Sequence, residues 1–274
     1  MTTEQILKLA LEMSGLREVP ADTAIYVPGA GIRRVLVGID LEGPELLLAR
    51  ERGVDLALAH HPAGGTAVLR MDEVFSRHVG LMVKAGVPEP AARAAVEGKL
   101  FDDRLTGQAR NYARLPALAR ALGIAYMNVH TPLDEIGRGR MAEAAAELQP
   151  DDTVADLIAH FRERFGEFRN ALTDIAIPVG DAGNRVGRVA VAHGAGTNGG
   201  YPVAKAYFDH GVDTVVYIHV SASDARRLRE EYAGRGKNLV VTGHIASDSV
   251  GINPFLAALR ERGLEVVTLD IVEP

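Results

Sequence analysis

Short runs of consecutive apolar residues alternate along the chain with segments in which apolar residues recur at helical spacing. The apolar runs predict strands at 33–40, 54–61, 125–130, 185–192, 213–220, 237–243 and 264–272. The helical spacing predicts helices at 3–14, 43–53, 73–85, 89–99, 106–122, 138–166 (broken near Gln149-Pro150), 202–210, 222–234 and 254–262. Strands that are apolar along their whole length and alternate with helices indicate an α/β protein with mostly parallel sheets.

Two stretches of the chain follow the same succession of elements. Each has a strand, a helix, the sequence Gly-Val-Asp (beginning at Gly53 and at Gly211) and a second strand that ends in histidine. Each is followed by a later strand that ends in His-x-x-x-Asp. The pattern predicts two similar α/β lobes with their strand ends facing a shared site. The alternative is that Gly-Val-Asp is a common loop before a strand, without duplication.

The predicted domains are residues 1–137, the first α/β lobe, and residues 138–274, which contain a helical connection and the second lobe. The division assigns the first His-x-x-x-Asp to the first lobe and the glycine-rich loop with the second His-x-x-x-Asp to the second. Exchange of terminal segments between the lobes is compatible with the same pattern.

Histidines gather at the carboxyl ends of the predicted strands. Six of the nine lie there: His60, His61, His130, His193, His219 and His244. Ligands of open α/β sheets bind outside the carboxyl ends of the strands. Aspartates follow two of these histidines by four residues, giving the pairs His130/Asp134 and His244/Asp248. Imidazoles with carboxylates suit zinc, iron or manganese, so we expect a metal or substrate site.

Each motif also has a structural interpretation. The adjacent rings of His60 and His61 could straddle two ions at a frayed strand end, or they could face solvent. Thr131 is a suitable N-cap residue, which puts Asp134 at position N3 of the helix. The Asp134 carboxylate could therefore cap backbone N–H groups, or it could be a metal ligand. His130 could be a ligand or could hydrogen-bond one from the second shell.

The second pair and the neighbouring loop also leave alternatives open. His244 and Asp248 share a face if a helix begins at once, whereas Asn253-Pro254 favours a later start. The loop Gly194–Gly200 could present backbone N–H groups to an anion, or it could be a flexible turn. His78, His160 and His210 lie within helical patterns, and we expect structural roles for them.

Composition narrows the class of protein. The 274 residues are 47% hydrophobic and 24% charged, which is typical of a globular fold. A net charge of −6 and 5% aromatic residues argue against a nucleic-acid partner. Cysteine is absent, so metal ligands must be His, Asp or Glu. No apolar run approaches the roughly 20 residues of a membrane span, and we expect no signal peptide and a cytoplasmic protein.

Three motifs together resemble the Nif-three-like dinuclear metal-centre proteins, which include members labelled GTP cyclohydrolase-like. They are Val35–Asp40 followed by Gly53–Pro62 with its His-His-Pro end, Val129-His-Thr-Pro-Leu-Asp134, and Thr242-Gly-His-Ile-Ala-Ser-Asp248. The resemblance covers most of the chain. It implies two α/β lobes, a toroidal homohexamer and a centre of two divalent ions. The ligands it implies are His60, His61, Asp134, His244 and Asp248.

The chain departs from the family pattern at three positions. Asp248 stands where the family has glutamate, and a shorter carboxylate reaches less far toward a bridging position. His193 replaces a glycine, and His219 lies where the family has a Thr-Gly-Glu or Thr-Gly-Asp element.

We therefore predict a cytoplasmic, dinuclear metal-dependent hydrolase of a small phosphorylated or nucleotide-like molecule. His130 and His219 are the predicted second-shell or proton-transfer groups. The alternative is a non-catalytic metal-binding scaffold or regulatory protein that forms a ring.

Overall fold

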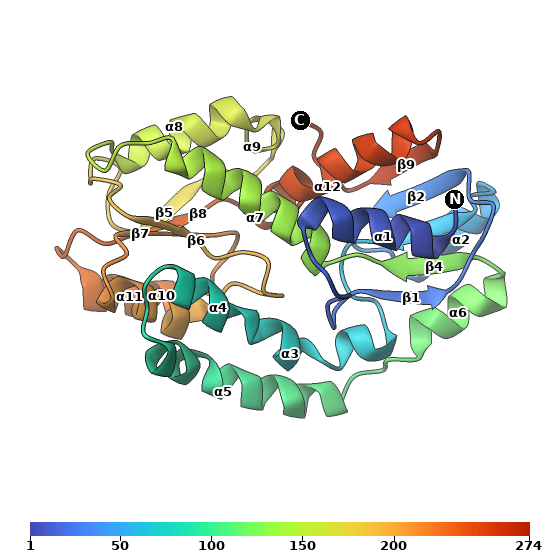
Figure 1. The fold of residues 1–274 in the computed structure, drawn as a ribbon, viewed down its shortest axis with the longest axis horizontal. Helices are drawn as coiled ribbons and strands as arrows, with labels where there is room; N and C mark the ends of the chain where they lie inside the picture. The colour runs from blue at the N-terminus through green and yellow to red at the C-terminus, as the bar shows by residue number, and fades with distance from the viewer. The chain divides into compact units, whose positions relative to one another are not determined.

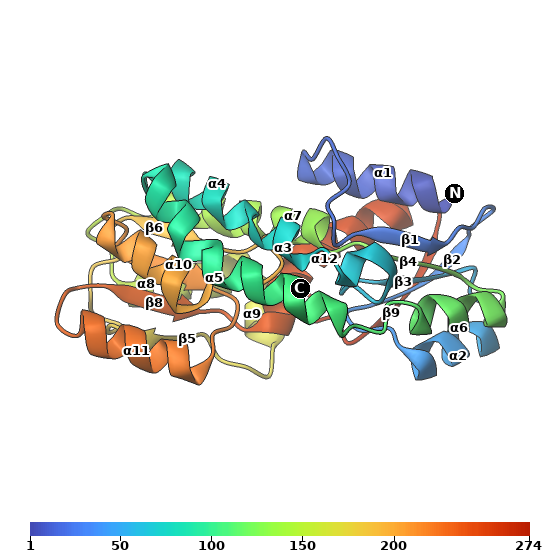
Figure 2. The ribbon, with the colours of Figure 1, turned by 90° about the horizontal axis from the view of Figure 1, so that it is seen from below.

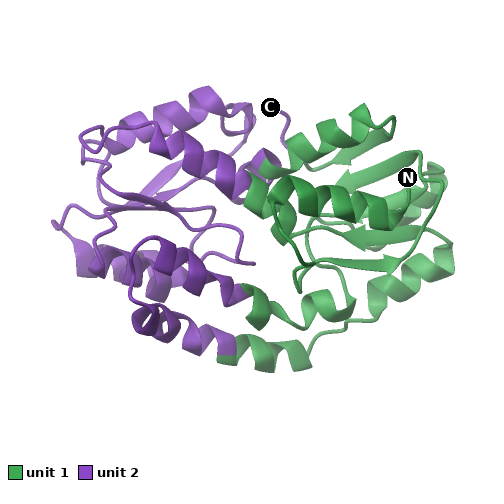
Figure 3. Cartoon of the chain, in the orientation of Figure 1, with its two compact units in different colours: residues 1–74, 101–136, 251–271 green, residues 75–100, 137–250, 272–274 purple.

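The computed structural model describes all 274 residues, which form two compact units (Figure 3). Unit 1 consists of residues 1–74, 101–136 and 251–271, and unit 2 consists of residues 75–100, 137–250 and 272–274. Each unit is therefore assembled from three separate stretches of chain.

A five-stranded sheet forms the centre of unit 1. Its strands are β1 (Ala24–Val27), β2 (Arg34–Gly38), β3 (Leu56–Ala59), β4 (Ala125–Asn128) and β9 (Glu265–Leu269). Their order is β1-β4-β3-β2-β9, with β1 antiparallel to β4 and every other pair parallel. The carboxyl ends of β2, β3, β4 and β9 consequently share one edge of the sheet.

Helices cover both faces of this sheet. Unit 1 contains the helices α1 (Thr3–Ser14), α2 (Gly43–Glu51) and α6 (Arg114–Leu122) and a 3₁₀ turn (Gly65–Val68). Four further helices have residues in both units: α3 (Met71–Phe75), α5 (Glu89–Gln108), α7 (Thr131–Ala146) and α12 (His244–Glu261). Ile6 of α1 and Phe255 of α12 pack with Val35, Leu56 and Met127 on one face. The alternate residues of the strands face α2 and α6, which lie side by side on the opposite face (Figure 2).

Unit 2 has the same three-layer construction. Its strands are β5 (Ala176–Val179), β6 (Val189–Val191), β7 (Thr214–Tyr217) and β8 (Asn238–Val241), in the order β5-β8-β7-β6 with β5 antiparallel. Its helices are α4 (Arg77–Lys84), α8 (Val154–Arg164), α9 (Gly166–Asn170), α10 (Gly200–Asp209) and α11 (Ala222–Tyr232). The helices α7 and α8 pack on one face, and α10 and α11 on the other (Figure 1).

The two units repeat one topology. An antiparallel edge strand (β1 or β5) precedes three parallel strands in the same spatial order, β4-β3-β2 or β8-β7-β6. Gly53 and Gly211 both have positive φ, 62° and 88°, before the second parallel strand. Asp55 and Asp213 follow them and accept hydrogen bonds from backbone N–H groups at or just before the neighbouring strand. The predicted fold class, two similar α/β lobes with mostly parallel sheets, is confirmed.

Several elements of the structure differ from the predicted ones. The four-residue edge strands β1 and β5 were not predicted. The predicted helix 106–122 is two helices, since α5 ends at Gln108 and α6 begins at Arg114. The last helix begins at His244 and continues through Pro254. Pro254 cannot donate to the carbonyl of Val250, but Arg140 Nη1 donates to that oxygen at 2.6 Å.

Candidate metal centre

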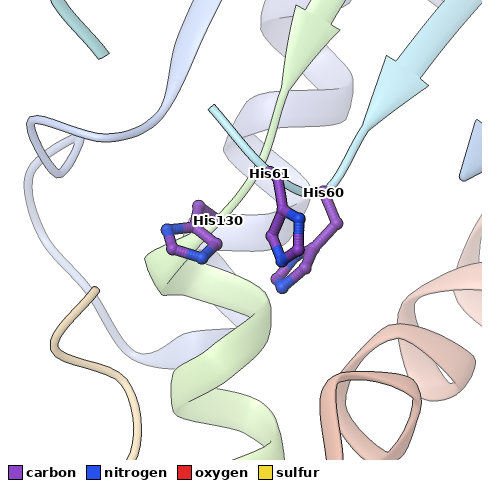
Figure 4. Close-up of side chains that lie close together, drawn as sticks. All are labelled: His60, His61 and His130. Carbon is purple, nitrogen blue, oxygen red and sulfur yellow. The ribbon is translucent and has the colours of Figure 1, made fainter. Parts of the chain in front are cut away.

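A first cluster of four side chains lies at the carboxyl end of the unit 1 sheet. His60 and His61 directly follow β3, and His130 lies between β4 and α7 (Figure 4). Asp134 lies in the first turn of α7. One ring nitrogen from each histidine lies within 4.8 Å of the other two. His60, His130 and Asp134 are buried and His61 is partly exposed. The structure thus brings together all four predicted site residues of this lobe.

Each histidine of the first cluster has an oxygen acceptor at Nδ1. His60 Nδ1 lies 3.0 Å from the carbonyl of Val129, and His61 Nδ1 lies 2.8 Å from Asp40 Oδ1. His130 Nδ1 lies 2.7 Å from Asp22 Oδ2. Because a carbonyl or carboxylate oxygen accepts, Nδ1 carries the proton in all three rings. In the neutral rings the lone pair is therefore on Nε2, the nitrogen that would coordinate a metal.

His60 and Asp134 present electron pairs to each other. His60 Nε2 lies 3.2 Å from Asp134 Oδ1, and His130 Nε2 lies 3.8 Å from Asp134 Oδ2. Two lone pairs facing across 3.2 Å in a buried site repel unless a proton or a metal ion lies between them. The helix α7 does begin at Thr131, but its Asp134 carboxylate faces these rings.

Asp22 supports this cluster and was not identified from the sequence. Its side chain is fully buried, and Oδ2 also accepts a hydrogen bond from the Thr131 hydroxyl at 2.7 Å. A carboxylate behind a histidine fixes the ring orientation and raises the basicity of its other nitrogen. Asp22 lies 108 residues before His130, just ahead of the unpredicted strand β1. No local motif connects the two residues.

A second cluster lies at the corresponding edge of the unit 2 sheet. His244 Nε2 lies 3.2 Å from Asp248 Oδ2, four residues further along α12. His193, which follows β6, places Nε2 at 3.9 Å from Asp248 Oδ1. His219 follows β7, and its ring centroid lies 4.8 Å from that of His244. Asp248 is buried and His244 is partly exposed. His193, a departure from the family pattern, therefore contacts a predicted ligand.

His219 has the opposite hydrogen-bond arrangement to the histidines of unit 1. Asn198 Oδ1 accepts the backbone N–H of Gly200 at 3.0 Å, which directs Asn198 Nδ2 toward His219 Nδ1 at 2.6 Å. An amide NH₂ can only donate, so His219 Nδ1 accepts and Nε2 carries the proton of the neutral ring. His219 Nε2 is consequently a hydrogen-bond donor in this arrangement.

Helix α4 holds the glycine-rich loop that contains Asn198. His78 Nε2 donates to the carbonyl of Thr197 at 2.9 Å, and Arg77 Nε donates to the carbonyl of Gly194 at 2.9 Å. His78 is completely buried, and this burial lowers its pKa to about 4. The loop is thus fixed by side chains of a neighbouring helix, and His78 has the structural role expected from the sequence.

The donor set of both clusters suits a divalent metal ion. Two ligands that bind one ion at about 2.1 Å lie roughly 3.0–3.5 Å apart. The His60–Asp134 and His244–Asp248 pairs, each at 3.2 Å, meet that spacing. Imidazole with carboxylate and no thiolate is the ligand chemistry of zinc, iron and manganese. The residues present therefore fit a metal centre.

The fold and these clusters define a class: a two-lobed α/β protein with histidine–aspartate clusters at its strand ends that can hold a metal ion. A solved NIF3 superfamily protein from Sphaerobacter thermophilus is 49% identical to the chain, with 98% of each chain covered and a TM-score of 0.94. The chain belongs to the NIF3 superfamily.

More distant structures share the fold. Reduced HcgD from Methanocaldococcus jannaschii has 15% identity and a TM-score of 0.57, with coverage of 99% of this chain and 98% of that one. A Bacillus cereus protein related to NIF3 has 13% identity and a TM-score of 0.54, with coverage of 98% and 96%. No protein-family model and no curated protein matches the chain. None of its helices combines the length and apolarity needed to cross a membrane.

Proposed function

We propose that the chain is a dinuclear metal-dependent hydrolase that acts on a small phosphorylated or nucleotide-like molecule. The observation that carries this proposal is the repeated pair of imidazole and carboxylate, spaced 3.2 Å apart, in two units of the same topology. In this proposal His60, His61, Asp134, His244 and Asp248 together hold two divalent ions. When bound, such ions supply Lewis-acid activation of a water molecule and of the attacked group.

The side chains around the ligands would have distinct tasks. Asp22, Asp40 and the carbonyl of Val129 keep the protonated nitrogen of each unit 1 histidine away from the metal side. His130 would either bind a metal or hold a proton near Asp134. His219 would donate a hydrogen bond from Nε2 to the substrate, because Asn198 fixes the proton on that nitrogen.

The proposal is tested by hydrolysis as a function of metal loading. A panel of phosphomonoesters, phosphodiesters and nucleotides is incubated with chelator-treated protein and with protein reloaded with zinc, iron or manganese. We expect turnover that requires metal and that falls at least a hundredfold in His219→Gln at unchanged metal content. Full activity in the metal-free protein would contradict the proposal. A fully loaded protein without turnover would favour a non-catalytic scaffold.

The assembly and the compartment belong to the same proposal. We propose a homohexamer in the cytoplasm, on the basis of the family resemblance. Light scattering coupled to size-exclusion chromatography gives the mass of the assembly, and a mass near that of one 29.3 kDa chain would contradict the hexamer.

A further inference from the structure

A polar cavity of about 260 Å³ lies in unit 1 beside the first cluster. Its wall includes His61, a predicted metal ligand, together with the charged side chains Asp40, Glu42, Arg110 and Arg114. The volume is slightly below the range of about 300–1,000 Å³ that is usual for small-molecule sites. The cavity therefore suits a small ligand, or one end of a larger ligand, next to His61.

The two arginines of this wall have no charged partner. Arg110 and Arg114 are exposed, and neither guanidinium forms an ion pair or a side-chain hydrogen bond in the structure. Asp40 Oδ1 accepts a hydrogen bond from His61 Nδ1 at 2.8 Å, so one oxygen of this carboxylate is used by the predicted ligand. Two guanidinium groups without carboxylate partners in one cavity favour an oxyanion, because each can donate two parallel hydrogen bonds to it.

The backbone segment that carries the two arginines packs against the loop that follows His61. The loop that follows His61 donates a hydrogen bond from Gly65 N to the carbonyl of Tyr112 at 2.8 Å. A Cβ atom on Gly64 would lie 2.8 Å from that carbonyl oxygen, so the two segments pack too closely for a larger residue. The arginine segment and the histidine loop thus form one packed wall of the cavity.

We infer that this cavity is a phosphate subsite, in which Arg110 and Arg114 bind the phosphate of a phosphorylated small molecule whose remaining part extends toward His61. The dianionic charge of a phosphomonoester matches two guanidinium groups better than a single carboxylate does. Glu42 and Asn111, on the same wall, would accept or donate hydrogen bonds to hydroxyl groups of the substrate. The link to catalysis rests on the proposed function, whereas the binding of phosphate does not.

Titration of inorganic phosphate into the chelator-treated full-length chain tests the inference, because removal of metal eliminates coordination of phosphate by the ions. The variants are Arg110→Gln and Arg114→Gln. Arg120→Gln is the matched control, since Arg120 is an exposed arginine on α6, the helix that begins at Arg114, and does not line the cavity. Isothermal titration calorimetry gives the Kd, acetate replaces phosphate in a parallel arm, and elemental analysis gives the metal content of each reloaded variant.

We expect phosphate binding that is weakened about tenfold or more by each cavity variant and less than twofold by Arg120→Gln. Equal weakening by all three variants, or no phosphate binding by the chelator-treated parent, would overturn the subsite. Acetate binding as tightly as phosphate would overturn the assignment to phosphate. Normal metal content in both cavity variants shows that a failure of the subsite is separate from a failure of the metal centre.

Discussion

Replacement of Asp22 by asparagine removes one charge from behind the first cluster and changes no predicted ligand. Asp22 is fully buried and accepts two hydrogen bonds of 2.7 Å, from His130 Nδ1 and from the Thr131 hydroxyl, both at Oδ2. The amide of Asp22→Asn can present either its oxygen or its NH₂ group to His130. With the oxygen there, both hydrogen bonds remain but lose the assistance of the carboxylate charge. With the NH₂ group there, His130 Nδ1 must accept, so the proton moves to Nε2, which then cannot coordinate a metal.

The expected effect follows from the loss of that support. The magnitude applies to the first of the two roles proposed for His130, that of a metal ligand. Removal of a partner behind a metal-binding histidine typically weakens metal affinity by about 10–100-fold, which corresponds to roughly 1.4–2.7 kcal/mol. The assay is competition for zinc between the protein and a chromophoric chelator, which gives the Kd of parent and variant. Asp55→Asn is the control. It also replaces an aspartate of unit 1 that accepts two hydrogen bonds, from the backbone of Arg33 and Arg34.

We expect Asp55→Asn to leave the zinc affinity within twofold of the parent value. The same Kd in Asp22→Asn and the parent would refute the assignment of Asp22 to the metal centre. Equal weakening in both variants would show that the loss reflects general destabilisation of unit 1 and not the contact with His130.

Three further predictions address unit 2. Because the pKa of buried His78 is about 4 in the fold and near 6.5 when unfolded, His78 should account for roughly 2–3 kcal/mol of the fall in the free energy of unfolding of the metal-free protein from pH 6.5 to pH 4; chemical denaturation should show a fall smaller by that amount in His78→Gln. Asn198→Asp replaces the donor to His219 Nδ1 with an acceptor, so ¹⁵N NMR should show the His219 proton moved to Nδ1; an unchanged tautomer would contradict the assignment. Phe161→Ala removes a fully buried ring and should lower the unfolding free energy by about 3–5 kcal/mol; a loss under 1 kcal/mol in denaturant titration would be inconsistent with that burial.

The central parallel strands were predictable because both of their faces are buried. Residues such as Val35 and Leu36 pack into different layers, so the sequence is apolar without interruption. The edge strands β1 (Ala-Ile-Tyr-Val) and β5 (Ala-Ile-Pro-Val) are apolar as well, but Pro28 directly follows the first and Pro178 lies inside the second, and proline argues against a strand. The start of α12 could not be predicted, because Pro254 indicates a later start. The hydrogen bond from Arg140 to the Val250 carbonyl, between residues 110 positions apart, satisfies the oxygen that Pro254 leaves without a donor.

Some residues of the candidate site could be predicted from the sequence and others could not. His60, His130 and Asp134 were predictable because strand ends and i, i+4 spacing are local properties of the sequence. Asp22 and Asn198 were not, since each acts through a histidine that is distant in sequence. Asp22 belongs to no motif, and the glycine-rich loop that contains Asn198 gives no sign of the contact with His219. Local patterns therefore identified the candidate ligands, and tertiary structure was needed to identify the residues that orient the histidines.

Metal content per chain is the direct test of a dinuclear centre built from the two clusters. Protein purified without chelator is analysed for zinc, iron and manganese beside His61→Ala and His244→Ala, one variant for each cluster. We predict about two ions per chain in the parent and a loss of metal in both variants. Circular dichroism should show that both variants retain the fold. A parent that binds no stoichiometric metal after reconstitution, or variants that keep the full content, would contradict a dinuclear centre built from these residues.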